Sequence, residues 1–111
     1  MPPQPSPGPV FAALADPTRR EIFETLARTG SGTATALTSA FGISRQAIAK
    51  HLSLLNEAGL TSATRAGRET VHTPQLEPLH ALTDWVAVVE GDWSRRLGAL
   101  SDYVTKACET T

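Results

Sequence analysis

The residues with the clearest chemical potential lie between positions 41 and 60, in the segment FGISRQAIAKHLSLLNEAGL. Gly42 relaxes the backbone ahead of Ser44, whose side chain can cap the first free amides of a helix, and Gly59 can end that helix. Apolar side chains recur at helical spacing along one face. The side chains that we expect to face outward near the start are those of Arg45, Gln46, Ala47, Lys50 and, in part, His51.

A short capped helix with a small residue and polar donors near its start suits the major groove of DNA. Gln46 can pair bidentately with adenine, and Arg45 can reach guanine or a phosphate. Ala47 would allow close approach or touch a thymine methyl group. Lys50 and His51 are predicted to contact phosphates, which position a protein without specifying sequence. Taken alone, these residues fit the solvated face of an ordinary helical domain equally well.

A helix of this kind must be held by a preceding helix and a tight turn. Asp16 can cap a helix that has Pro17 in its first position, where the missing amide costs nothing, and this helix is predicted to run to about Arg28. A shorter helix is expected from residue 33 or 35 to residue 40, followed by the turn at Gly42. A short helix, a turn containing glycine and a second helix form the helix-turn-helix layout.

The hydrophobic pattern changes after the second helix. Residues 60–65 and 69–73 are rich in threonine, valine and alanine around the pair Ala66-Gly67, which predicts a two-stranded β-hairpin. We call this hairpin the wing. Arg65 and Arg68 lie near its tip, where they could reach into a minor groove or along phosphates. The alternative is an edge hairpin that carries charge for solubility alone.

From about residue 77 the chain is predicted to be helical almost to its end, with Pro78 in the first turn. Apolar side chains recur every seven positions, and a second row fills the neighbouring stripe. A helix of this length would extend ~40 Å, which is more than a small domain can cover alone. The stripe therefore predicts a homodimer. Its two rows are Leu79, Val86, Trp93 and Leu100, and Leu82, Val89, Leu97 and Val104.

The 111 residues predict one domain over residues 10–111, after an uncharged, proline-rich and disordered arm over residues 1–9. The formal net charge is −1, but the charge is unevenly distributed. An acidic region follows residue 76, whereas the middle of the chain is basic, and a local basic face can bind phosphate in a neutral protein. The charged residues between positions 43 and 68 are Arg45, Lys50, Glu57, Arg65 and Arg68.

Several classes of protein are disfavoured. A single cysteine, Cys108, permits no internal disulfide and fits a reducing cytoplasm. No apolar run approaches the ~20 residues that span a bilayer, and the start lacks the layout of a signal peptide. We therefore expect a soluble cytoplasmic protein without a membrane partner, associated with the nucleoid when it is bound to DNA.

Metal binding has one candidate pair. His80 and Asp84 are four residues apart on one helix face and could ligate an ion, with Cys108 of a second chain as a further ligand. Two ligands do not complete a site, and surface residues on a solvated face are the more frequent explanation. No pattern for a nucleophile or a phosphate-binding loop is present. The sequence thus predicts no metal, no cofactor and no enzymatic activity.

Three segments resemble the ArsR-type winged helix-turn-helix transcriptional repressors. They are LADPTRREIFETLA at Leu14–Ala27, SRQAIAKHLSLLNEAGL at Ser44–Leu60 and RAGRETVHTPQLEPL at Arg65–Leu79. The C-terminal segment DWVAVVEGDWSRRLGALSDYV resembles one branch of that family, and the resemblance covers roughly residues 10 to 105. The cysteine pair and the histidine-containing patterns of metal-sensing members are absent, so metal binding is not carried over.

The resemblance implies a mainly α (α+β) winged helix-turn-helix with a two-stranded β-hairpin wing and a long C-terminal dimerisation helix. It places the recognition helix and the wing on the DNA-binding residues Ser44, Arg45, Gln46, Ala47, Lys50, His51, Arg65 and Arg68. It also implies that helices over about 10–28 and 76–106 form the dimer interface, for which we select Phe11, Leu79, Leu82, Val86, Val89, Trp93, Leu97 and Leu100.

The function we predict is a homodimeric, sequence-specific repressor that binds double-stranded DNA at an inverted-repeat operator. Its two recognition helices should enter successive major grooves. One alternative is a metal-, redox- or small-molecule-responsive repressor that uses His80, Asp84 or Cys108. A second alternative is a protein-interaction module without DNA, whose long helix pairs with a different chain.

Overall fold

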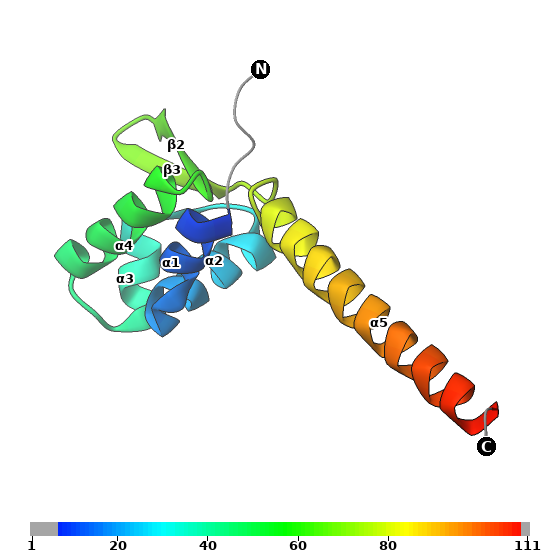
Figure 1. Cartoon of the computed structure of the whole chain (residues 1–111). Helices are drawn as coiled ribbons and strands as arrows, with labels where there is room; N and C mark the ends of the chain where they lie inside the picture. The colour runs from blue at the N-terminus through cyan, green and yellow to red at the C-terminus, as the bar shows by residue number, and fades with distance from the viewer. Residues whose placement is uncertain (1–6, 110–111) are drawn as a thin grey trace.

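The computed structural model describes residues 7–109, and Figure 1 shows a helical body with a hairpin at one edge and one long helix projecting from it. The predicted fold class is confirmed. None of the helices within residues 7–109 combines the length and the hydrophobicity that a membrane span requires. In chain order the elements are α1 (Pro7–Ala15), α2 (Pro17–Thr29), β1 (Gly32–Thr33), α3 (Ala34–Phe41), α4 (Arg45–Glu57), β2 (Thr61–Ala66), β3 (Glu69–Pro74) and α5 (Leu79–Glu109).

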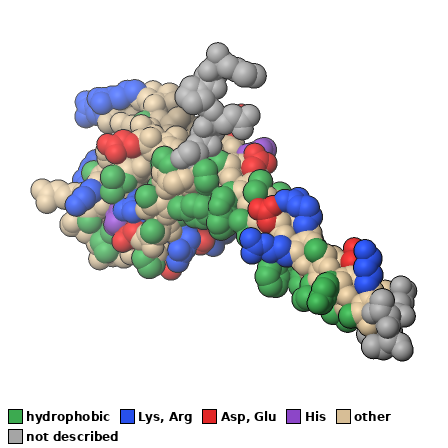
Figure 2. Space-filling model, viewed as in Figure 1, with side chains coloured by type: hydrophobic (Ala, Val, Ile, Leu, Met, Phe, Trp, Pro, Cys, Tyr) green, Lys and Arg blue, Asp and Glu red, His purple; other side chains and the backbone are tan. Residues whose placement is uncertain are grey.

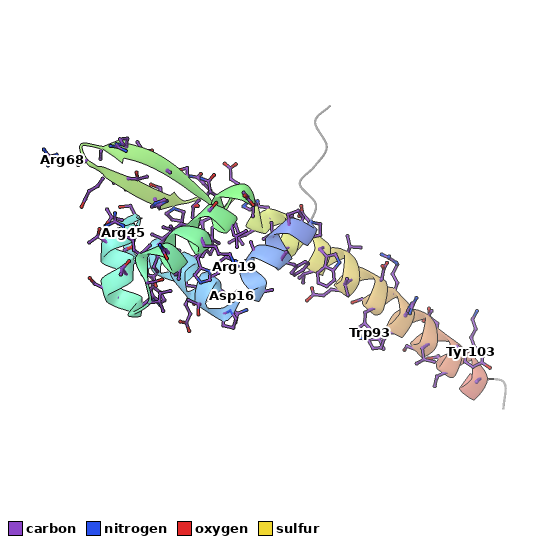
Figure 3. All side chains as sticks on the ribbon, turned by 90° about the vertical axis from the view of Figure 1, so that its left-hand side faces the viewer. Asp16, Arg19, Arg45, Arg68, Trp93 and Tyr103 are labelled. Carbon is purple, nitrogen blue, oxygen red and sulfur yellow. The ribbon has the colours of Figure 1, made fainter. Side chains whose placement is uncertain are left out.

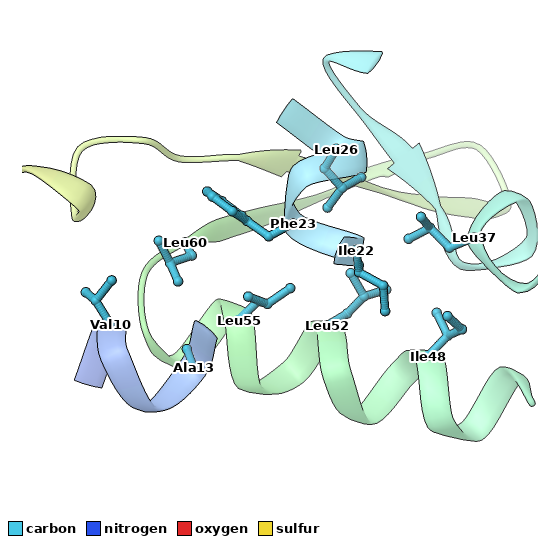
Figure 4. Close-up of a cluster of buried hydrophobic side chains, with 10 residues drawn as sticks. All are labelled: Val10, Ala13, Ile22, Phe23, Leu26, Leu37, Ile48, Leu52, Leu55 and Leu60. Atoms are coloured by element: carbon cyan, nitrogen blue, oxygen red, sulfur yellow. The ribbon is translucent and has the colours of Figure 1, made fainter. Parts of the chain in front are cut away.

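One hydrophobic core joins the first four helices (Figure 4). The apolar stripes of α2 and α4 face each other, and the side chains of Ile22, Leu26 and Ile48 are inaccessible to solvent. Burial of a leucine or isoleucine side chain stabilises a fold by roughly 1.5–3 kcal/mol. The position of α4 is therefore set by its packing against α2. The core residues are Val10, Ala13, Ile22, Phe23, Leu26, Leu37, Ile48, Leu52, Leu55 and Leu60.

Both ends of α4 follow from local signals. The Oγ atom of Ser44 accepts a hydrogen bond from the amide of Ala47 at 3.1 Å, as the capping motif predicted. At the other end Gly59 adopts φ +77°, and the amide of Leu60 donates to the carbonyl of Leu55 at 2.9 Å. This left-handed termination turns Leu60 into the core, where it is fully buried.

The sheet has three antiparallel strands in the order β1-β3-β2. The predicted wing hairpin is confirmed, with Ala66 opposite Glu69 across a two-residue turn of Gly67 and Arg68. The additional strand β1 pairs with β3 at Gly32 and Thr33. Two residues carry no strand pattern of their own, so β1 exists only because it is paired with a distant segment.

Helix α1 differs from the prediction at its start. Residues 7–9, which were predicted to belong to the proline-rich arm, form its first turn. Proline is tolerated there because the first amides of a helix have no hydrogen-bond partner within the helix. The part of the arm over residues 1–6 lies outside the described residues. The buried face of α1 comprises Val10 and Ala13, whereas Phe11 remains 42% exposed.

Helix α5 begins on the body and then leaves it. Leu79 and Leu82 pack against the core, whereas the stripe beyond them is exposed. Its 31 residues correspond to about 46 Å, so most of its length has no cover from the rest of the chain. Figure 2 shows hydrophobic side chains along one side of the projecting helix.

Candidate nucleic-acid interface

The outward face of α4 carries three of the predicted DNA-contacting residues. Arg45, Gln46 and Lys50 are exposed, because the buried residues of the helix occupy the opposite face. The amide-rich first turn of α4 contains no acidic residue. The start of α4 therefore combines free amides, the positive end of the helix dipole and a cationic side chain. This arrangement is suited to a phosphate or an electronegative base edge.

A groove of about 570 Å³ lies between the start of α3, the outer side of α4 and the wing. We call it the wing groove. It brings together three residues that the sequence analysis selected separately, namely Arg45 on α4, Arg65 on β2 and Arg68 at the tip of the hairpin. Figure 3 shows Arg68 at the outer end of the wing and Arg45 below it. The remaining lining residues are Thr33, Ala34, Thr35, Ala49, Glu69, Thr70 and His72.

The three arginines of the wing groove are available to an external anion. Two pairs of oppositely charged groups lie within the described part of the chain: Asp92 with Arg95, and Asp16 with His51, which is charged only when it is protonated. Neither pair uses Arg45, Arg65 or Arg68. Unpaired guanidinium groups around one concavity suit the bidentate binding of phosphate oxygens.

The groove also contains residues that the sequence analysis did not select. Thr33, Thr35 and Thr70 place hydroxyl groups beside the arginines, and Ala49 rather than Ala47 lines the groove from α4. The spacing signal for Ala49 was present, because it lies one helical turn after Arg45 and shares its face. Thr33 was recognised only as a helix start, and it does cap α3 by accepting the amide of Ala36 at 3.1 Å.

His51 and Ala47 lie on another flank of α4 and are not brought into the wing groove. The Nδ1 atom of His51 is 4.0 Å from Oδ2 of Asp16, at the start of α2, and the His51 side chain is only 18% exposed. The described contacts of the His51 side chain are with the protein itself. Its predicted contact with a phosphate stays a prediction. His51 and Ala47 are both half-buried.

Six of the eight predicted dimer residues are exposed, whereas Leu79 and Leu82 pack against the core. Phe11 of α1 packs edge to face against Trp85 of α5, with ring centroids 5.3 Å apart. From there the exposed stripe continues to the distal half of α5, where Trp93 is 60% exposed. Tyr103, which was not selected, also lies exposed on α5. The stripe residues from the predicted set are Val86, Val89, Trp93, Leu97 and Leu100.

The candidate metal pair gathers no third ligand among the side chains that the structure describes. His80 and Asp84 are both exposed on α5. No group of three or more histidine, cysteine, aspartate or glutamate residues in that part of the chain could hold an ion. The side chain of Cys108 lies outside the described residues.

His72 of β3 lines the wing groove, and we expect it to make folding sensitive to pH. Burial lowers its pKa below the usual 6.5, and its buried Nδ1 has no hydrogen-bond partner among the described residues. Because burial disfavours the protonated form of His72 in the folded state, the contribution of neutral His72 to the free energy of unfolding should be fully present above about pH 6.5. This contribution should be lost as the pH falls through the folded pKa.

We expect this loss to be visible between pH 7.5 and pH 5.0 in urea unfolding, and to be smaller in His72→Gln. His80→Gln changes an exposed histidine and is the matched control. Its free energy of unfolding should depend on pH as in the wild type. If the free energy of unfolding falls with pH as steeply in His72→Gln as in the wild type, another group accounts for the pH dependence. Asp16 does not interfere, because its pKa is lowered below 3.8, mainly by the hydrogen bond from the amide of Arg19.

Comparison with known sequences places the chain among DNA-binding regulators. A family model described as a helix-turn-helix domain matches residues 14–62, which contain α2, α3 and α4. The chain is 40% identical over 84 residues to the uncharacterised HTH-type transcriptional regulator YuzN of Bacillus subtilis, covering 69% of this chain and 91% of YuzN. It is 34% identical over 77 residues to the transcriptional repressor SdpR of the same organism, covering 69% and 84%.

Solved structures agree with these sequence matches. An ArsR-like transcriptional regulator from Rhodococcus sp. RHA1 superposes with a TM-score of 0.74 at 38% identity, covering 84% of this chain and 87% of that one. The homodimeric winged helix-turn-helix DNA-binding domain of Mb0332 from Mycobacterium bovis gives a TM-score of 0.61 at 28% identity, covering 77% and 78%. In both cases the shared region includes most of each chain.

Proposed function

Because this chain belongs to the ArsR family of winged helix-turn-helix transcriptional regulators, we propose that it is a homodimeric repressor acting at an inverted-repeat operator. The observation that carries the proposal is the wing groove, where three unpaired arginines from α4 and the wing surround one concavity. Family membership already makes the protein a DNA-binding transcriptional regulator. What we add is the set of contacts, the assembly and the direction of control.

We assign base recognition to the start of α4. Gln46 projects outward between the exposed Arg45 and Lys50, and its amide can pair with adenine in the major groove. Arg45 lines the wing groove at the start of α4. From this position its guanidinium can reach a guanine or the phosphate beside it. Lys50, one turn after Gln46, serves as a phosphate contact.

We assign backbone contacts to the wing. Arg65 and Arg68 project from the hairpin on the far side of the groove from α4. A DNA strand that leaves the major groove beside α4 would meet this second row of cations. The groove hydroxyls of Thr33, Thr35 and Thr70 add neutral donors for phosphate oxygens.

The homodimer would form through the exposed stripe of α5 together with Phe11 of α1. Both supply apolar side chains that the rest of the described chain leaves uncovered, and a contiguous apolar surface of this kind is typical of an interface between subunits. The homodimeric state of the Mb0332 domain supports this assembly. A twofold axis would present two copies of α4 to half-sites about one helical turn, or ~34 Å, apart.

Repression would be steric, since an operator covered by the dimer excludes the polymerase. The similarity to the repressor SdpR supports this direction of control. The direct experiment is recovery and sequencing of the genomic fragments that the protein binds in cells. We expect a shared inverted repeat near a promoter, with transcription rising when the protein is deleted. Fragments without a common repeat would contradict the operator, and falling transcription would contradict repression.

Arg68→Ala should weaken binding to every DNA sequence. Arg68 lies at the wing tip, so its loss removes a phosphate contact from each subunit without touching the core. Each lost phosphate contact should lower the slope of log affinity against log salt by roughly 0.9. Fluorescence anisotropy with two unrelated duplexes at several salt concentrations measures this slope.

Arg95→Ala provides the control for Arg68→Ala, because it removes an equal charge from the projecting part of α5. It should leave the salt slope as it is in the wild type. If Arg68→Ala also leaves the slope unchanged, the wing makes no phosphate contact at its tip.

A further inference from the structure

Asp16 is shared by two elements of the fold. Its Oδ2 atom accepts a hydrogen bond from the amide of Arg19 at 2.9 Å and thereby caps α2. The same oxygen lies 4.0 Å from Nδ1 of His51 on α4. The Arg19 amide is the main cause that lowers the pKa of Asp16, so the carboxylate is ionised at neutral pH. One charged oxygen therefore faces both α2 and α4.

The His51 nitrogen that faces Asp16 has no other partner. Nδ1 is sealed from solvent and makes no hydrogen bond within the part of the chain that the structure describes. A buried nitrogen without a partner is unusual and calls for an explanation. A movement of about 1 Å that brings α4 toward α2 would turn this contact into a charge-assisted hydrogen bond of ordinary length.

The same corner holds the end of α1. The guanidinium of Arg19 donates to the carbonyls of Ala13 and Ala12, the latter at 3.1 Å, and Arg20 donates to the carbonyl of Leu14 at 3.0 Å. Figure 3 shows Asp16 and Arg19 together in the body of the protein. Since α1 carries Phe11, which packs on Trp85 of α5, the corner lies between the proposed dimer face and α4.

We propose that Asp16 and His51 are a positioning pair that fixes α4 relative to the corner of α1 and α2, and so sets the separation of the two α4 helices in the dimer. This inference rests on the proposed function. It assigns His51 a role inside the protein in place of a phosphate contact. Closure of the pair accompanies binding to operator DNA, where both copies of α4 must fit two half-sites at once.

Binding to operator DNA and to DNA of other sequence should therefore depend differently on the pair. Base contacts require each α4 at a defined depth and angle, whereas phosphate contacts at the wing tolerate small displacements. A chain that lacks the pair should keep its wing groove and its salt dependence. It should lose part of its preference for the operator and for one half-site spacing.

Asp16→Asn and His51→Gln test this proposal. Asparagine is as good a helix cap as aspartate, so Asp16→Asn retains the bond to the Arg19 amide and removes only the charge that faces His51. Operator affinity is measured for both single variants and for the double variant. We expect each to lower it about tenfold, and the double variant to match the single ones because the pair acts as one unit.

Affinity for unrelated DNA and the salt slope should stay as in the wild type. Glu21→Gln, which removes an exposed charge from the same helix α2, is the matched control and should not affect operator affinity. Additive losses in the double variant, or no loss in Asp16→Asn, would overturn the proposal. So would a His51→Gln salt slope lower by roughly 0.9 for each subunit, since that identifies a phosphate contact. A wild-type chain that binds no DNA selectively would instead refute the proposed function.

Discussion

The double variant Trp93→Glu and Leu97→Glu is expected to be a folded monomer that no longer binds the operator at concentrations where the wild type saturates it. Both side chains are exposed in the single chain, 60% and 47% respectively, so glutamate at these positions should leave the core intact. In a symmetric dimer four such side chains become buried. Because about half of each side chain is already buried in the single chain, about 1–1.5 kcal/mol would be lost for each, and the dimer would be weakened by roughly 4–6 kcal/mol.

Light scattering and operator titration of this double variant measure the two consequences separately. A monomer offers one α4 instead of two, so operator affinity should fall to that of a single half-site. Ser94→Glu, on the polar side of the same turn of α5, is the matched control and should remain dimeric. If the double variant still forms a dimer of wild-type stability, the α5 stripe is not the interface.

The double variant Arg45→Ala and Gln46→Ala is expected to remove sequence preference with little effect on stability. Both side chains are exposed, and the cap at Ser44 is untouched. Each bidentate base contact discriminates by about 1–3 kcal/mol, so operator affinity should fall at least ~100-fold. Affinity for unrelated DNA should fall only a few-fold, because one cation per subunit is lost.

Competition gel shifts with operator and unrelated duplexes measure both affinities of the Arg45 and Gln46 variant. Lys50→Ala is the control, since a phosphate contact should weaken both DNAs alike. Equal losses on both DNAs in the Arg45 and Gln46 variant would mean that the start of α4 contacts only the backbone. In that case base recognition would have to come from another surface.

Local signals in the chain predicted most of the elements. Asp16, Ser44 and Gly59 each act on amides or carbonyls within one helical turn, and all three end or begin helices as expected. The hairpin and the long α5 follow in the same way from short-range pattern. The seven-residue stripe also indicated where the chain is uncovered, because a helix in isolation already shows which side chains share a face.

Other features depended on distant contacts. Strand β1 has two residues and exists through pairing with β3, so no local pattern could reveal it. The first turn of α1 includes two prolines, which composition alone assigned to a disordered arm. Ala49 shares the helix face of Arg45, and the placement of the wing decides that this face, and not that of Ala47, lines the groove.

Local signals in the sequence were enough to predict helices α2, α4 and α5, the cap of α4 and the apolar side of α5. These properties depend on the periodicity of the backbone and on hydrogen bonds between near neighbours. Long-range packing brings Arg45, Arg65 and Arg68 to one groove and places His51 opposite Asp16. Those contacts join residues far apart in the chain, and their geometry is set by the packing of α2 against α4 and by the pairing of β3 with two strands.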